Sequence, residues 1–162
     1  MDNLDAVINK VGFEIANILD ENLINKLLGV LANDGVYAMW VYALNKIEWN
    51  YYNDCEKFRQ SKLYKLLEKL NNFPIQIDKK IIDEKRNDEI CKLTKEINEL
   101  KKDKNNKTKK EEKNKKIKER DDKLNEFFLE LSTDLNQLLF FKELLEKALI
   151  YARYHAKAMK DE

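Results

Sequence analysis

Apolar residues recur at steps of three and four along most of the chain, the spacing of one face of an α-helix. This spacing predicts a first helix that ends near residues 20–22 and a shorter second helix that stops at 33–35. Gly35 tolerates a bend there, and Asp34 or Asn33 can cap the helix that follows. Two further helices are predicted over about 36–54 and 56–70, before Asn71-Asn72-Phe73-Pro74 breaks the helical pattern.

The second half of the chain alternates between apolar and fully polar stretches. Four apolar residues follow a three-four-three spacing that is typical of a two-helix coil: Ile90, Leu93, Ile97 and Leu100. Residues 101–116 then contain no apolar residue, and apolar spacing resumes over 117–131. An antiparallel helical hairpin that turns near residues 104–106 and a disordered loop between two helices fit this pattern equally well.

A long final helix is predicted from about residue 135 to residue 159. Asp134, with Gln137 three residues later, resembles a helix-capping arrangement. Three glycines and one proline are too few for a protein built of many turns, which favours an all-α fold. We therefore predict a single all-α domain over 1–162, a helical bundle of about five or six helices. A lysine-rich helical hairpin or loop insertion over 101–120 is expected to protrude from it or to be disordered.

Charge is distributed unevenly although the formal net charge is only +1. Residues 101–120 hold eleven Lys/Arg against four Asp/Glu, whereas residues 1–54 hold three Lys against eight acids. A dense cationic segment attracts polyanions whatever the average charge is, so nucleic acid is the first partner to consider. The structural alternative is a solvated lysine-rich loop.

The helix predicted over 56–70 has a second basic surface. Its leucines form one face, and the opposite face is basic, a candidate for following a phosphate backbone. The basic residues are Lys57, Arg59, Lys62, Lys65 and Lys69. The aromatic segment before it could form a stacking platform for bases, but at helical spacing we assign it to the core. That segment includes Tyr37, Met39, Trp40, Tyr42 and Tyr51.

Residues typical of catalysis are scarce. His155 is the only histidine, so motifs that need two histidines are absent, and there is no glycine-rich phosphate loop. Cys55 and Cys91 lie far apart without CxxC spacing, so we expect reduced thiols and a cytoplasmic protein. No apolar stretch approaches the ~20 residues that cross a bilayer. We predict no enzyme activity, no metal or other cofactor, and no membrane partner.

Three segments resemble the small α-helical subunit of type III-B CRISPR effector complexes, the Cmr small subunit. They are GVYAMWVYALNK (Gly35–Lys46), SKLYKLLEKL (Ser61–Leu70) and the ending FFKELLEKALIYARYHAKAMKDE. Relative to that family, the lysine-rich section between Pro74 and Leu124 looks like an enlargement of a shorter connection.

The resemblance implies a noncatalytic subunit that stacks in several copies beside guide RNA and helps to hold target RNA, with other CRISPR effector subunits as partners. It implies RNA contacts at Lys46 and Arg153, in addition to the basic residues of the 56–70 helix. The alternative from another class is a structural adaptor that binds a protein through the coiled hairpin, with its lysines serving only solubility.

Overall fold

The computed structural model describes residues 3–47, 55–101 and 107–160. The chain is helical in these ranges and contains no strand there, so the predicted all-α class is confirmed. Where the sequence predicted about five or six helices with an added hairpin or loop, these ranges contain eight helices. They are α1 (Leu4–Ile18), α2 (Glu21–Asp34), α3 (Val36–Lys46), α4 (Cys55–Arg59), α5 (Lys62–Leu70), α6 (Glu84–Lys101), α7 (Lys107–Leu131) and α8 (Leu135–Lys160).

Short polar side chains cap α1, α2 and α8, as the sequence indicated for α8. The predicted cap at Asn33 or Asp34 was wrong, because both residues belong to α2 and α3 begins after Gly35 without a side-chain cap. The Oδ1 atoms of Asn3, Asp20 and Asp134 accept hydrogen bonds from backbone amides in the first turns of α1, α2 and α8. These bonds satisfy amides that have no partner within the helix. Gly35 separates α2 from α3 with a φ of 95°, a conformation that favours glycine.

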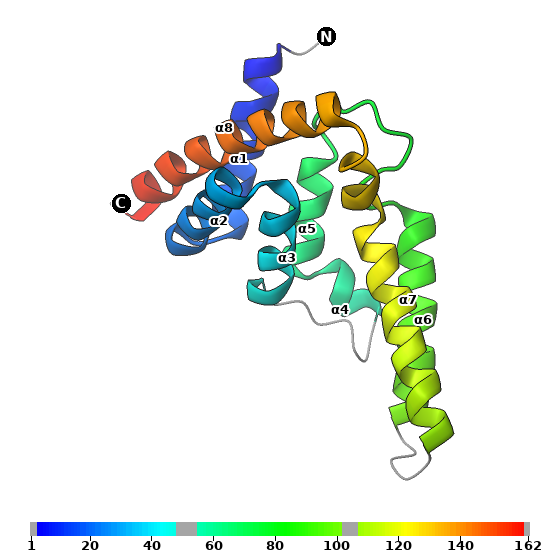
Figure 1. The fold of residues 1–162 in the computed structure, drawn as a ribbon. Helices are drawn as coiled ribbons and strands as arrows, with labels where there is room; N and C mark the ends of the chain where they lie inside the picture. Colours follow the sequence, from blue (N-terminus) through cyan, green and yellow to red (C-terminus); the bar gives the residue numbers. More distant parts are fainter. Residues whose placement is uncertain (1–2, 48–54, 102–106, 161–162) are drawn as a thin grey trace.

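The long helix α8 is the centre of the apolar core. It packs against α1 and α2 and buries one face, and Figure 1 shows it crossing α1 while α2 runs alongside it. The buried residues of α8 are Phe141, Leu144, Leu145, Ala148, Leu149, Ala152 and Ala156. Three of these residues are alanines, Ala148, Ala152 and Ala156, and their small side chains allow α1 to approach closely.

The closest approach of α1 to α8 occurs at Gly12. A Cβ atom at residue 12 would lie 2.7 Å from the carbonyl oxygen of Ala148 and 2.9 Å from the Cβ atom of Tyr151. Both distances are shorter than van der Waals contact, and one involves backbone that cannot rotate away. Only glycine therefore permits this separation of the two helices.

The aromatic residues of α3 divide between core and surface. Trp40 is buried, stacks on Phe128 of α7 with ring centroids 4.4 Å apart, and donates from Nε1 to Oδ1 of Asn125 at 2.6 Å. Met39 is also buried, so the core assignment is confirmed for these two residues, whereas Tyr37 is exposed. Tyr51 lies outside the described residues.

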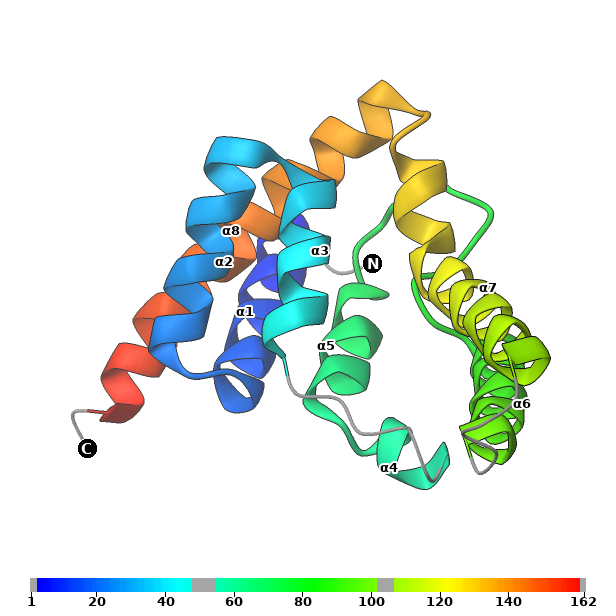
Figure 2. The same ribbon diagram turned by 60° about the horizontal axis from the view of Figure 1, so that its bottom comes forward.

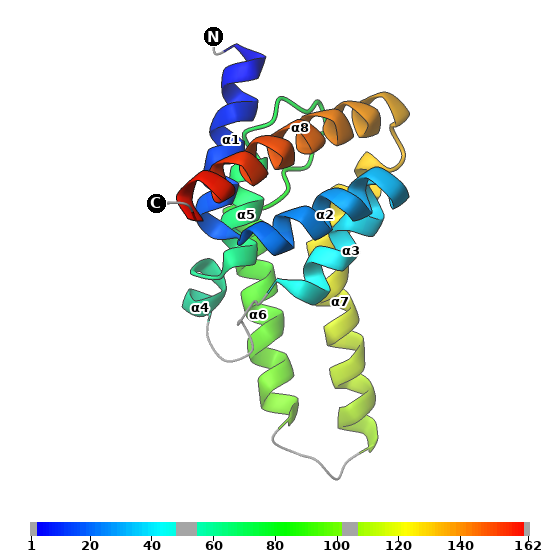
Figure 3. The ribbon, with the colours of Figure 1, turned by 90° about the vertical axis from the view of Figure 1, so that its left-hand side faces the viewer.

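Helices α6 and α7 pack side by side and extend away from the other helices (Figures 1 and 3). In Figure 2 they lie on one side of the molecule, with α1, α2 and α8 on the other. Of the four residues predicted to form the coil seam, Ile90 and Ile97 of α6 are almost completely inaccessible, and Leu93 and Leu100 are half-buried. Of the two predicted alternatives, the helical pair is present up to Lys101 and from Lys107. The expected turn near residues 104–106 lies outside the described residues.

None of the described helices has both the length and the apolar character needed to cross a membrane.

Gly12 provides a direct test of the α1–α8 crossing. We expect Gly12→Ala to lower the free energy of unfolding by about 1–3 kcal/mol, because the added methyl group overpacks a contact with backbone. Urea denaturation followed by circular dichroism measures this change. Gly29→Ala in α2 is the matched control, since a Cβ atom there meets no atom within 4 Å. The control is expected to gain about 0.5–1 kcal/mol from helix propensity. Equal effects at the two glycines would contradict a tight crossing.

Candidate nucleic-acid interface

The basic face predicted over residues 56–70 lies on two helices rather than one. The chain turns at Gln60 and Ser61, and the Oγ atom of Ser61 accepts a hydrogen bond from the amide of Tyr64 at 3.1 Å. Ser61 thus caps α5 and separates it from α4. The prediction of a continuous helix was wrong because apolar periodicity persists across this break.

Three lysines form a row along the outer side of α5, at steps of three and four residues. Lys62 and Lys65 are exposed, and Lys69 is half-buried. The opposite face is buried as predicted, through Leu63, Leu66, Leu67 and Leu70. The lysines are therefore held on a helix whose orientation is fixed by the core.

A groove runs between this row and α1. Lys65 and Lys69 line it together with Glu14 and Glu68, and its volume is about 420 Å³. The two glutamates reduce the positive potential inside the groove, so the lysine row is most cationic on its outer side, at Lys62 and Lys65.

Arg59 has a different environment from the lysines with which it was grouped. Its Nη2 atom lies 2.9 Å from Oε2 of Glu84 and 3.7 Å from Oδ1 of Asp88, both on α6. When the side-chain oxygen of the buried Asn87 faces the guanidinium of Arg59, it accepts hydrogen bonds from Nε and Nη2 at 2.7 and 2.9 Å. Arg59 thus joins α4 to α6, whereas Lys57 on α4 is exposed.

The two residues implied by the family resemblance lie on other helices. Lys46 is exposed in the last turn of α3, with Nζ 6.0 Å from the ring centre of Tyr42. Arg153 is half-buried on α8, with its guanidinium carbon 5.5 Å from the ring centre of Tyr154. The structure thus distributes Lys46, Arg153 and the lysine row over three helices, α3, α8 and α5.

The lysine-rich run forms the first half of α7. Its outer part and the facing part of α6, residues 107–118 and 92–101, hold ten lysines against four glutamates; we call these residues the hairpin tip. Arg120, counted in the run, is only 4% exposed and contributes little to the surface. The predicted cationic segment is therefore largely helical, and most of its charge lies on a surface that extends from the bundle.

Ion pairs connect the two helices of this hairpin. Lys116 lies 2.7 Å from Glu96, and Lys123 lies 3.0 Å from Glu89. The hydrogen bond that each lysine donates to its glutamate raises the pKa of that lysine, so both remain cationic at neutral pH. Both pairs are partly exposed to solvent and contribute little to stability, so the buried apolar seam holds the helices together.

The buried Arg86 fixes the loop before α6. It donates hydrogen bonds to the carbonyl oxygens of Lys80 and Ile81 and forms an ion pair with Glu126 of α7 at 3.2 Å. Sequence reasoning missed this role, because nothing in a basic residue's local sequence signals burial.

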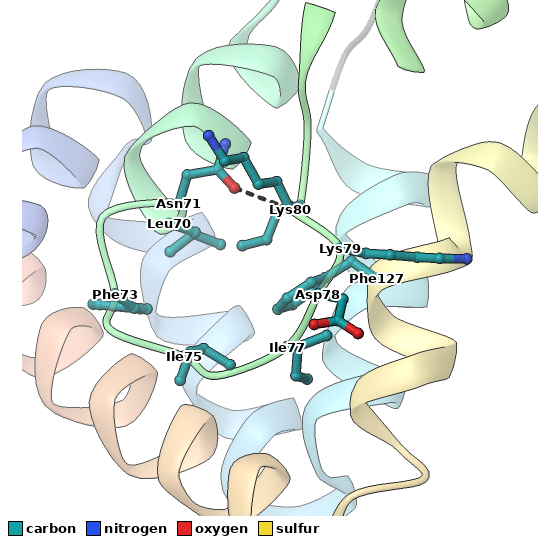
Figure 4. Close-up of a pocket in the computed structure, with 10 residues that line it drawn as sticks. Leu70, Asn71, Phe73, Ile75, Ile77, Asp78, Lys79, Lys80 and Phe127 are labelled. Carbon is teal, nitrogen blue, oxygen red and sulfur yellow. Dashed lines mark hydrogen bonds between the residues drawn. The ribbon is translucent and has the colours of Figure 1, made fainter. Parts of the chain in front are cut away.

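The loop encloses a pocket of about 230 Å³ beside α7. Figure 4 shows apolar side chains such as Ile75 and Ile77 around it, with Phe127 reaching in from α7 and Lys79 directed away. Asn71 closes one side, where its Oδ1 accepts a hydrogen bond from the amide of Ile81 at 2.9 Å. The lining is suited to an apolar group rather than to acid–base chemistry.

The cysteine prediction requires a correction. Cys91 is disulfide-bonded rather than a reduced thiol. The chain contains one other cysteine, Cys55, whose side chain lies outside the described part. Sequence spacing was a poor guide to the state of Cys91, because contacts between distant parts of the chain, such as those of Arg59 with α6, are not visible in it.

His155 contacts neighbours on α1. Its Nε2 atom lies 3.1 Å from Oδ1 of Asn9, and its ring meets Phe13 edge to face with centroids 5.3 Å apart. Within the described ranges, no group of three or more His, Cys, Asp or Glu side chains is placed to hold a metal ion.

Comparisons of the chain with protein-family models, with curated proteins and with solved structures find no match. The functional argument therefore rests on the residues and their geometry.

Arg59 and Lys62 are expected to respond differently to the same substitution. Arg59→Gln should lower the free energy of unfolding by about 1–3 kcal/mol, because the buried Asn87 loses its donors. Lys62→Gln is the matched control on the exposed face and should change stability by no more than about 0.5 kcal/mol. Urea titrations of both variants measure the difference. An Arg59→Gln variant as stable as the wild type would show that Arg59 does not join α4 to α6 in solution.

Proposed function

We propose that this protein is a noncatalytic RNA-binding subunit that contacts the phosphate backbone through lysines on helix faces. The observation that carries the proposal is the lysine row of α5, Lys62, Lys65 and Lys69, on a helix whose other face is buried. Affinity for phosphates without base contacts is independent of sequence, which suits a protein that must accept many RNA sequences.

The hairpin tip adds a second cationic surface. It extends from the bundle (Figure 3), so an RNA strand can approach it without meeting the acidic N-terminal part of the chain. Lysines on a rigid helical pair keep their spacing when RNA binds, and little conformational entropy beyond that of the side chains is lost.

We further propose that the subunit acts in an RNA-guided type III CRISPR effector complex. In this role several copies stack beside guide and target RNA, other subunits cleave, and Lys46, Lys57 and Arg153 add phosphate contacts. The support is the sequence resemblance, whose three segments correspond to α3, α5 and α8. These helices share one core, in which Leu27, Trp40, Leu67 and Leu149 lie around a common small cavity.

The alternative of a structural adaptor is less favoured. It requires the apolar residues of the hairpin to be available to a partner, but Ile90 and Ile97 are buried within the chain. A partner would have to displace α7 or use another surface.

Two exposed lysines of the row test the proposal. About five phosphate contacts on a single strand give a slope near −3.5 in a plot of log affinity against log salt, since each contributes roughly −0.7. The double variant Lys62→Gln with Lys65→Gln should weaken binding of single-stranded RNA and reduce this slope by about 1.4. Fluorescence anisotropy over a series of salt concentrations measures both quantities.

The matched control removes the same charge elsewhere. Lys26→Gln with Lys142→Gln has the same net charge as the test variant, and its slope should equal that of the wild type. Equal slopes for the test and control variants would mean that only net charge matters and would contradict an RNA-binding face on α5.

For the CRISPR assembly, purification from the native host should yield guide RNA with larger subunits. A single protein partner without RNA would favour the adaptor.

A further inference from the structure

Three exposed aromatic rings gather where α8 crosses α1. Tyr154 and Tyr151 of α8 are 62% and 42% exposed, and Phe13 of α1 is 49% exposed. The two helices approach at Gly12, where the Cβ atom of Tyr151 lies beside α1, and the next residue, Phe13, contacts His155 of α8. Large aromatic side chains are usually buried, so three exposed rings on one surface suggest a binding role.

Contacts with neighbours limit the freedom of these rings. Phe13 packs edge to face on His155, with the ring planes at 89°, and His155 is in turn bonded to Asn9. The guanidinium of Arg153 lies over the ring of Tyr154. The rings thus lose little freedom when a ligand binds.

The surroundings of the rings are cationic on α8, whereas α1 contributes Lys10 against Asp5 and Glu14. From Lys147 to Lys160 the chain contains four Lys/Arg and no Asp or Glu. Basic residues near a helix C-terminus also offset the helix dipole, which accounts for Lys157 and Lys160 without any ligand. The helix dipole does not account for the exposed rings, which carry no charge.

Aromatic rings beside cations suit single-stranded nucleic acid. Every base has an aromatic face that can stack on tyrosine, and neighbouring lysine and arginine side chains can contact the phosphates between bases. A base-paired strand keeps its bases stacked on each other, so it can offer this surface only its backbone.

We propose that the surface formed by Phe13, Tyr151, Tyr154 and Arg153 stacks unpaired bases of a single RNA strand. It rests on the proposed function and deepens it: the lysine row gives affinity for any phosphate backbone, and this surface gives a preference for single strands. The preference does not depend on base identity, because stacking is tolerant of sequence.

Substitutions of Tyr154 test the proposal. Tyr154→Leu keeps apolar bulk and removes the ring, and Tyr154→Phe keeps the ring and removes the hydroxyl. Binding of the full chain is measured with single-stranded RNA and with a blunt RNA duplex of the same length, at one salt concentration. Tyr154→Leu should weaken single-strand binding roughly five- to ten-fold, near the lower end for base stacking. Tyr154→Phe should bind like the wild type, and duplex binding should be unchanged in both variants.

Each other outcome overturns the proposal. Wild-type affinity of Tyr154→Leu for single strands, equal losses of affinity in the Leu and Phe variants, or equal losses for single strand and duplex all contradict stacking.

Sedimentation of the same variants without RNA tests whether this surface instead joins two copies of the chain. If Tyr154→Leu dissociates an oligomer and RNA affinity is unchanged, the surface is a protein interface. If base stacking on this surface is contradicted, the salt slope measured for the lysine-row variants still stands. The stacking proposal and the phosphate-binding proposal can therefore fail separately.

Discussion

The structure depends on the close approach of α1 to α8 at Gly12. Because residue 12 has no side chain, α1 lies directly against the backbone at Ala148. This contact closes the core around Ile8, Ile15 and Ala152, all of which are nearly inaccessible to solvent. α5 packs on α1, so the direction in which its lysine row faces also follows from this crossing. The same approach brings Phe13 beside the aromatic residues of α8.

Much of the fold could be predicted from the sequence because it follows from local patterns. A helix with one buried face leaves a period of three to four residues in its apolar positions, and caps such as Asp134 act within one turn. The buried face of α5 and the helices before and after residues 102–106 were predicted on this basis. The break at Ser61 was missed because the apolar period continues through it.

The residues that sequence reasoning could not place interact with distant parts of the chain. Arg59 and Arg86 read as surface cations, yet one is bonded to buried Asn87 and the other is itself buried. Phe13, Tyr151 and Tyr154 gave a weak signal, since none of them lies on the apolar stripe of its helix. An aromatic residue off the stripe must either meet a neighbouring element or remain exposed, and only the fold distinguishes these outcomes.

The functional account rests on the lysines of α5 and of the hairpin tip. The chemical reactivity of their side-chain amines tests it most directly. Lysine acetylation quantified by mass spectrometry, with and without single-stranded RNA, reports which amines the RNA covers. The account predicts protection at Lys62, Lys65 and the hairpin tip, with the reactivity of Lys26 and Lys142 unchanged. Uniform protection of all lysines, or none on α5 and the hairpin tip, would contradict binding of RNA by these two surfaces.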